Sequence, residues 1–324
     1  MRKTFGLFLG MLVLMIGLFS AVALQASEKP TIAMIPKSLD NPVFLDAKTG
    51  GEKTAKELGV NFIWTGSNTA DAANEVTIIE GLIQKKVDGL IISCNEAGAL
   101  KDVIDRATAA GIKVATFDSD SPQSKRVFYC GTDNYKAGKA CGAAMVKLIR
   151  ERKLAGKTLT CALLTGGLAA PNLNDRIKGF KEVVAAEKIN LKYLNTLACD
   201  DDTNRAVELM EQYIKANPKL DTFFVVGGWP FFSAPGSMPN IKAWVKKGGI
   251  LVSMDTFYPV MVAMKDGLAN ALVGQNFTAM GELSVRTMVD LLNGKNVTEF
   301  IDTGIVNVDK SNFDKVFAET IPWK

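Results

Sequence analysis

Histidine is absent from the 324-residue chain, which removes the commonest general base and the usual zinc ligand. The motifs GxGxxG, GxxxxGKS/T and GxSxG are also missing, so dinucleotide-binding, P-loop and serine-hydrolase functions have no specific support. Two carboxylates from different parts of the chain could still flank a glycosidic bond. No other acid–base pair is recognisable, so we expect a protein that is not an enzyme and that uses no cofactor and no metal.

Runs of basic residues are missing too. The chain contains 38 Lys and Arg against 34 Asp and Glu, which gives a formal net charge of +4. A protein that binds a phosphate backbone needs a concentrated basic surface. We therefore expect no nucleic-acid partner.

Cysteine is scarce, and the five cysteines form no CxxC pair. Cys94, Cys130 and Cys161 lie in apolar runs typical of strands, which favours small buried side chains. A disulfide between Cys130 and Cys141 is the alternative in an oxidising compartment. The sequence does not settle the connectivity.

Residues 1–26 have the parts of a secretory signal peptide. Arg2 and Lys3 form a charged head, residues 5–19 an apolar stretch, and AVA (21–23) or LQA (24–26) a small-residue cleavage site. A membrane anchor is the alternative, but the apolar stretch is shorter than the ~20 residues that a spanning helix needs. No Cys lies near the cleavage site, so a lipid anchor is not indicated. We expect a soluble, monomeric periplasmic protein from which the signal peptide has been removed.

From residue 31 the chain alternates short apolar runs with amphipathic stretches of helical length. This pattern predicts strands near 31–36, 61–65, 88–93, 113–118, 127–131, 159–166, 191–197, 222–227, 250–255 and 271–276. Helices are predicted near 43–58, 71–86, 97–110, 135–152, 172–187, 203–216, 240–247 and 278–293, followed by a strand-like tail at 299–308. Such alternation is typical of βαβ units that form parallel sheets.

The second half of the chain repeats part of the first. VDGLIIS (87–93) corresponds to LDTFFVV (220–226), and GIKVATFD (111–118) corresponds to GGILVSMD (248–255). We therefore predict an α/β protein of two similar doubly wound, Rossmann-like domains. No low-complexity linker separates them, so the crossings near 132 and 276 are predicted to act as a hinge. The expected division is 27–132 with 277–300 and 133–276 with 301–324.

Polar and aromatic side chains follow the predicted strands, at the edge where ligands bind in open α/β sheets. The fourth strand of each half ends in an Asp that is followed four residues later by Pro, in TFDSDSP (116–122) and MDTFYP (254–259). The candidate ligand-binding residues are Lys37, Asn41, Phe44, Asp118, Arg176, Trp229, Asp255 and Gln275. Carboxylates accept hydrogen bonds from hydroxyls, guanidinium and amide groups donate them, and aromatic faces cover C–H groups. A polyhydroxylated ligand such as a sugar fits this set.

These candidates have structural alternatives. Asp118 and Asp255 could cap helices or form turns, and Arg176 could lie on a solvated helix face. Trp229 or Phe232 could belong to the core.

The acidic run CDDDTN (199–204) suggests a metal loop at first sight. It lacks calcium-loop spacing, and Asp favours helix N-termini. We therefore predict that it caps a helix beginning near Thr203.

The order and spacing of several motifs resemble those of the sugar-binding periplasmic proteins of ABC importers, the ribose-binding type. LDNPVF resembles the family's N-P-x-F element, FDSD its strand-end Asp and GTDNYKAG its first crossover. NDRIKGF resembles the Arg-bearing helix, VSMD the second Asp and GQN the Gln of the return crossover. The resemblance covers nearly the whole mature chain and implies the type I periplasmic binding protein fold, a monosaccharide ligand and an ABC permease as partner. It implies ligand contacts by Asn41, Phe44, Asp118, Arg176, Asp255 and Gln275.

Two positions depart from the pentose-binding pattern. Gly228 and Trp229 stand where those proteins have Asn-Asp, and Ser119 stands where they have Arg. Lys37 together with DSD (118–120) is instead similar to the receptors for autoinducer-2, a small furanose. That ligand, and a role in presenting a ligand to a chemoreceptor or sensor kinase, are the alternatives. A repressor of the same fold would carry a DNA-binding helix-turn-helix where this chain has the signal peptide.

Overall fold

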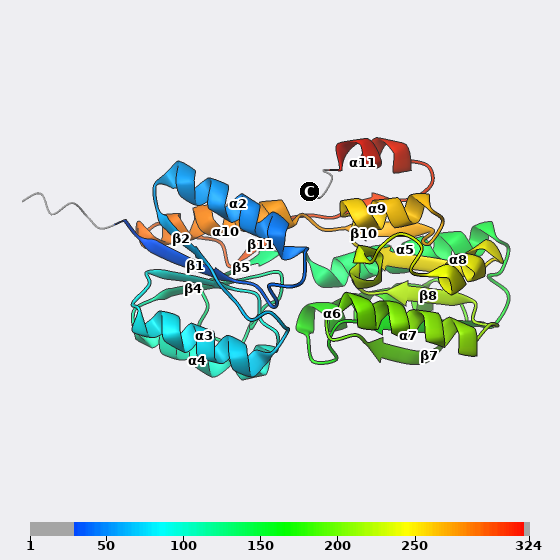
Figure 1. Cartoon of the computed structure of the whole chain (residues 1–324), viewed down its shortest axis with the longest axis horizontal. Helices are drawn as coiled ribbons and strands as arrows, with labels where there is room; N and C mark the ends of the chain where they lie inside the picture. Colours follow the sequence, from blue (N-terminus) through cyan, green and yellow to red (C-terminus); the bar gives the residue numbers. More distant parts are fainter. Residues whose placement is uncertain (1–28, 321–324) are drawn as a thin grey trace, which may run out of the picture.

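The computed structural model describes residues 29–320, and the expected signal peptide therefore lies outside the described residues. Two six-stranded sheets lie side by side, each with helices packed against it (Figure 1). The described elements confirm the predicted α/β architecture of two similar doubly wound sheets.

The two sheets have the same strand order. In the first, the order is β11 (Phe300–Asp302), β5 (Phe128–Gly131), β4 (Lys113–Phe117), β3 (Gly89–Ile92), β1 (Thr31–Ile35) and β2 (Asn61–Trp64). In the second, it is β12 (Val306–Val308), β10 (Ala271–Gly274), β9 (Ile250–Met254), β8 (Thr222–Val225), β6 (Leu159–Thr165) and β7 (Leu191–Ala198). The strand pairs are parallel except for β10 with β12. The strand ends that carry the candidate residues therefore lie on one edge of each sheet.

We call each sheet with its helices a lobe. The first lobe contains α2 (Phe44–Leu58), α3 (Ala72–Gln84), α4 (Ala97–Ala109) and α10 (Phe277–Leu292). The second contains α5 (Asn134–Glu151), α6 (Pro171–Ala186), α7 (Thr203–Ala216), α8 (Pro239–Lys246), α9 (Tyr258–Lys265), α11 (Phe313–Glu319) and the 3₁₀ helix η1 (Trp229–Phe232). The chain passes between the lobes three times: from β5 to α5, from β10 to α10, and from β11 to β12.

Several elements differ from the prediction. The helices α9 and α11 and the short η1 were not predicted. The tail at 299–308 is two short strands in different sheets, because Gly304 turns the chain with a φ of 75°.

Each lobe brings two helices close together at glycines. In the second lobe, a Cβ added to Gly138 on α5 would lie 2.7 Å from Cα of Arg176 on α6. In the first lobe, a Cβ added to Gly281 on α10 would lie 2.8 Å from the carbonyl carbon of Ala47 on α2. Real Cβ atoms essentially never approach other atoms within 3.0 Å, so both helix pairs require glycine at these positions.

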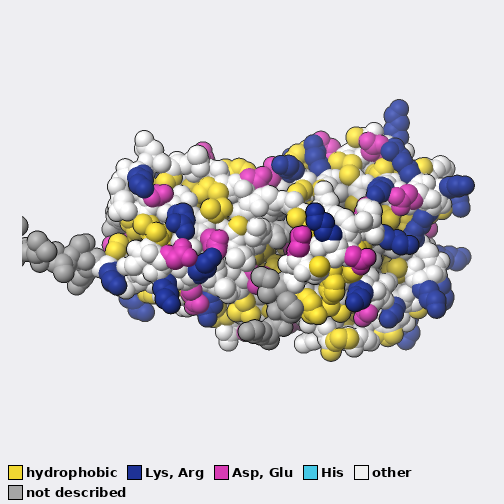
Figure 2. Space-filling view, turned by 90° about the horizontal axis from the view of Figure 1, so that it is seen from above, with side chains coloured by type: hydrophobic (Ala, Val, Ile, Leu, Met, Phe, Trp, Pro, Cys, Tyr) yellow, Lys and Arg dark blue, Asp and Glu magenta, His cyan; other side chains and the backbone are white. Residues whose placement is uncertain are grey.

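All five cysteines are buried and free, so the alternative disulfide between Cys130 and Cys141 is not formed. Within residues 29–320, no helix is long and apolar enough to cross a membrane. The face in Figure 2 carries Lys and Arg mixed with Asp and Glu, without a large patch of one sign.

Candidate ligand-binding site

A narrow cavity lies between the lobes. All eight candidate residues line it: Lys37, Asn41, Phe44, Asp118, Arg176, Trp229, Asp255 and Gln275. Gln275 is partly exposed, whereas the other seven are buried. Side chains that are far apart in the sequence therefore meet at one place, as the strand-end argument predicted.

Asp118 forms part of the first lobe's wall. It follows β4 directly and has a φ of 56°, in the left-handed region. Ser93 Oγ donates a 2.7 Å hydrogen bond to Asp118 Oδ2, and the Tyr129 hydroxyl donates one of 2.9 Å to its backbone carbonyl. The carboxylate is thus held by protein donors while it faces the cavity.

Asp255 has the same place in the second lobe. It follows β9 and also has a left-handed φ, 76°. The backbone N–H of Gly228 donates to Oδ2 at 2.7 Å, and Gln275 Nε2 donates to Oδ1 at 2.8 Å. Burial raises the pKa of Asp255, and the nearby Arg176 opposes this effect. The helix-cap alternative is wrong here, because α9 begins after Phe257 and has no side-chain cap.

Arg176 lies on α6 and is only 2% exposed, so the solvated-face alternative is wrong. Its Nε donates to Asn134 Oδ1 at 2.8 Å, Nη1 to the Val226 carbonyl at 3.0 Å, and Nη2 to Gln275 Oε1 at 2.7 Å. Three acceptors thus fix the plane of the guanidinium group.

Lys37 and Asn172 connect the lobes across the cavity. Lys37 Nζ donates to Asn172 Oδ1 at 3.0 Å, and Asn172 Nδ2 donates to Asp118 Oδ1 at 3.4 Å. Asn172 was not among the residues predicted from the sequence. It stands four residues before Arg176 on α6, so the two share a helix face, and this spacing could have identified it.

Aromatic rings form the apolar part of the cavity. The ring centroids of Phe44 and Phe277 are 5.6 Å apart in an edge-to-face arrangement. Trp229 and Phe232, both from η1, line the cavity too. Trp229 is 5% exposed, so the same ring belongs to the core and to the cavity wall.

Asp201 lines the cavity although it was predicted only as part of a helix cap. Its neighbour Asp202 caps α7, as predicted for this run, by accepting a hydrogen bond from the backbone N–H of Arg205. Because three Asp residues follow one another here, the sequence does not indicate which of them faces the cavity. Within residues 29–320, no group of three or more metal-ligating side chains is placed to hold a metal ion.

Glu75 lies buried on α3 in the first lobe and does not line the cavity. Its Oε2 accepts hydrogen bonds from the backbone N–H and the side chain of Asn95, which also donates to the Lys37 carbonyl. Burial raises the pKa of Glu75 to about 8. This carboxyl therefore titrates near neutral pH beside the backbone that carries Lys37.

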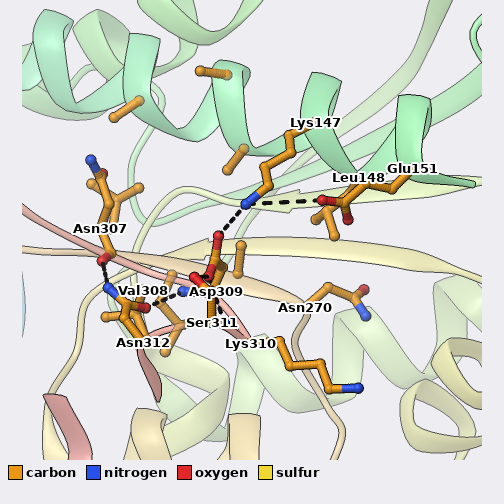
Figure 3. A pocket seen from close by; sticks show the side chains of 16 residues that line it. Lys147, Leu148, Glu151, Asn270, Asn307, Val308, Asp309, Lys310, Ser311 and Asn312 are labelled. Atoms are coloured by element: carbon orange, nitrogen blue, oxygen red, sulfur yellow. Dashed lines mark hydrogen bonds and ion pairs between the residues drawn. The ribbon is translucent and has the colours of Figure 1, made fainter. Parts of the chain in front are cut away.

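A larger hollow of about 1260 Å³ lies elsewhere, between α5, β10 and the segment that begins with β12. Figure 3 shows three of its charged side chains paired, with Lys147 contacting both Asp309 and Glu151. None of the candidate residues lines it. The cavity between the lobes is therefore the candidate site.

Comparisons with known proteins agree with this geometry. A family model described as "periplasmic binding protein domain" matches residues 32–296. The ribose import binding protein RbsB of Bacillus subtilis (strain 168) is 27% identical over 271 residues, which cover 84% of this chain and 84% of that protein.

Solved structures extend the similarity over both lobes. The ABC transporter solute-binding protein from Burkholderia graminis, in complex with D-arabinose, is 32% identical with a TM-score of 0.77, covering 88% of this chain and 96% of that chain. The structure of the XylFII–LytSN complex contains a chain that is 28% identical with a TM-score of 0.78, covering 87% of this chain and 98% of that chain. The family model alone spans most of both lobes, and the chain belongs to the periplasmic binding protein family.

Proposed function

We propose that this protein captures a small sugar, a monosaccharide, in the cavity between its lobes and delivers it to the permease of an ABC importer. The observation that carries the proposal is the pair Asp118 and Asp255, which follow equivalent strands and face one cavity with Arg176. Carboxylates accept hydrogen bonds from sugar hydroxyls, and a guanidinium group donates to hydroxyl and ring oxygens. The protein is not an enzyme, since the family consists of solute-binding proteins.

The named relatives support a sugar as ligand. RbsB is a ribose import binding protein, and the Burkholderia graminis protein was solved with D-arabinose. The aromatic rings around the cavity suit the C–H faces of a sugar ring. A dissociation constant near 1 μM corresponds to about −8 kcal/mol. A few hydrogen bonds to charged groups, at about 1.5–3 kcal/mol each, account for much of this after ordering costs.

We propose that the lobes close on the ligand by rotation about the crossings near 132 and 276. The predicted division at residue 300 falls inside β11, so we take the first lobe as extending to Asp302, because β11 pairs with β5 of the first sheet. The hydrogen bonds of Asn172 with Lys37 and Asp118 support this closure, because they join the two lobes across the cavity. Asn134, at the first crossing, also connects the lobes. Its Nδ2 donates to the Tyr129 hydroxyl, and its Oδ1 accepts a hydrogen bond from Arg176 Nε. The permease then recognises the closed form.

The family implies a periplasmic location. We propose that residues 1–26 are the signal peptide that directs export, and that the mature protein is a soluble monomer without a lipid anchor.

One observation favours a second function. Lys37 lies in the cavity beside Asn172 and Asp118, as expected for a receptor of an autoinducer-2-type furanose. The XylFII–LytSN structure is of a complex, so a similar protein binds a further component. Presentation of the ligand to a chemoreceptor or sensor kinase is the corresponding alternative role of the same site.

A thermal-shift screen separates these ligands. The mature protein is stripped of ligand by partial unfolding and tested against pentoses, hexoses, deoxy-sugars, polyols and autoinducer-2. A ligand that binds only the folded state stabilises it by about 4 kcal/mol at a thousandfold excess over the dissociation constant. A large shift with one or a few monosaccharides supports the importer function, and a shift with autoinducer-2 alone supports signal uptake. No shift with any of them would contradict both.

Asp118→Ala and Asp255→Ala test the site itself, by calorimetric titration with the sugar that the screen identifies. We expect both variants to fold and neither to bind. Asp102→Ala is the matched control, because this Asp lies on α4 with its side chain 83% exposed. Wild-type affinity in both cavity variants would refute the proposed site.

A further inference from the structure

Asp201 is fixed by an unusual stretch of backbone. Asp200 and Asp201 both have left-handed φ values, 53° and 57°, which non-glycine residues adopt uncommonly and Asp more readily than most. The backbone N–H groups of Cys199 and Asp200 donate to the carbonyls of Thr165 and Gly166 at 2.9 Å and 2.7 Å. The loop between β7 and α7 is therefore tied to the end of β6, and Asp201 is held at the cavity wall.

The Asp201 carboxylate lies beside Gly166, and the Trp229 ring approaches the same glycine. A Cβ added to Gly166 would lie 2.8 Å from Trp229 Cζ2 and even nearer to Asp201 Oδ1, so the carboxylate occupies the space beside this glycine. Gly166, which follows β6, and Trp229, which belongs to η1, therefore border the space that the Asp201 side chain occupies.

Asp201 Oδ1 is shielded from solvent and has no hydrogen-bond partner. Among the described residues that line the cavity, no other side-chain oxygen is both shielded from solvent and without a hydrogen-bond partner. The other two carboxylates of the cavity, Asp118 and Asp255, have donors from the protein for both oxygens. A buried carboxylate oxygen without a donor is costly, and such an atom in a binding cavity indicates that the ligand supplies the donor.

Charged groups of both signs surround Asp201. Burial raises the pKa of Asp201, whereas the positive charges of Lys37 and Arg176 lower it. Asp118 and Asp200 add negative charge that opposes these cations. A sugar hydroxyl can donate to Asp201 Oδ1 without adding a further charge to this group.

We infer that Asp201 is a specificity-determining residue that accepts a hydrogen bond from one hydroxyl group of the sugar, beside Trp229. This inference rests on the proposed function and adds a third carboxylate to the two that follow β4 and β9. A sugar that lacks this hydroxyl leaves Oδ1 without a donor in the closed cavity. Discrimination between sugars then follows from the position of that one hydroxyl.

The test is calorimetric titration of D-ribose, D-arabinose, D-xylose and their monodeoxy derivatives into the wild type and Asp201→Ala. For the sugar that binds the wild type most tightly, we expect Asp201→Ala to weaken binding roughly ten- to hundredfold. One monodeoxy derivative should bind the wild type more weakly by a similar factor. Asp201→Ala should no longer distinguish that derivative from its parent sugar.

Asp200→Ala is the matched control. It changes the same residue type in the same left-handed conformation, but its side chain is 60% exposed and pairs with Arg205 at the surface. We expect wild-type sugar affinity from it. Asp201→Gly provides the test where the Ala variant fails to fold, because Gly tolerates this backbone conformation and removes the acceptor.

The outcomes separate this inference from the proposed function. A wild type that binds none of these sugars contradicts the importer of small sugars, and the inference with it. Suppose instead that the wild type binds a sugar, and that the Asp201 variant keeps the same affinity and the same preference among the deoxy-sugars. This result overturns the inference about Asp201 but not the proposed function. Equal losses for every derivative would also overturn it, because they would indicate a structural role.

Discussion

Gly138→Ala tests whether the close approach of α5 to α6 positions Arg176. The added Cβ would lie 2.7 Å from Arg176 Cα, whereas ordinary contacts begin at 3.4 Å. The helices must therefore move apart at the residue whose guanidinium is held by hydrogen bonds of 2.7–3.0 Å. Overpacking of this kind costs about 1–3 kcal/mol of folding stability. Displacing Arg176 loses at least one hydrogen bond to a charged group, about 1.5–3 kcal/mol, so we expect binding to weaken roughly tenfold or more.

Urea denaturation measures the first effect, and calorimetric titration of the sugar found in the screen measures the second. Gly81→Ala is the control, because Gly81 lies within α3 and a Cβ there meets nothing within 4 Å. An alanine in an open helical position should stabilise the protein by about 0.5–1 kcal/mol and leave binding unchanged. If Gly138→Ala unfolds at the wild-type urea concentration and binds the sugar normally, the helices do not fix Arg176 as argued.

Three further predictions concern buried groups. Glu75 has a pKa of about 8 in the folded protein against about 4.5 in the unfolded chain. Between these pH values the folded state therefore binds more protons than the unfolded state. The free energy of unfolding falls as the pH rises, by at most about 1.4 kcal/mol per pH unit. Glu75→Gln should flatten this dependence in urea titrations from pH 5 to 8, and an unchanged slope would contradict the buried position. Asn172→Ala should weaken sugar binding and enlarge the ligand-free protein in small-angle scattering, because Lys37 and Asp118 lose their bridge across the cavity; an identical scattering curve would argue against the bridge. The five free, buried cysteines should not react with Ellman's reagent until the protein unfolds, and rapid labelling of the native protein would contradict their burial.

The sequence predicted the repeating parts of this fold well. Strands and long helices recur with a regular period, and Asp118 and Asp255 stand at the same place in two similar segments. Repetition within the chain is thus enough to identify two cavity residues. The left-handed backbone at both positions was not predictable, because the sequence does not reveal φ for an Asp after a strand.

The parts that were missed depend on contacts between distant segments. The helix α9 has only eight residues, mostly apolar, so it shows no amphipathic period. The still shorter α11 is held by stacking of Phe317 on Tyr258, which no local pattern reveals. Asn172 could have been found from its spacing to Arg176, whereas Asp201 becomes recognisable as a cavity residue only when the β7–α7 loop is seen at the cavity.

The passage of the chain between the lobes has a consequence for the order of folding. The first lobe takes α10 and β11 from residues 277–302, after the whole central part of the second lobe has been made. Its strand β5 pairs with β11 over a separation of about 170 residues, a contact of high sequence distance that forms slowly. A growing chain therefore cannot complete its first lobe until synthesis is almost finished.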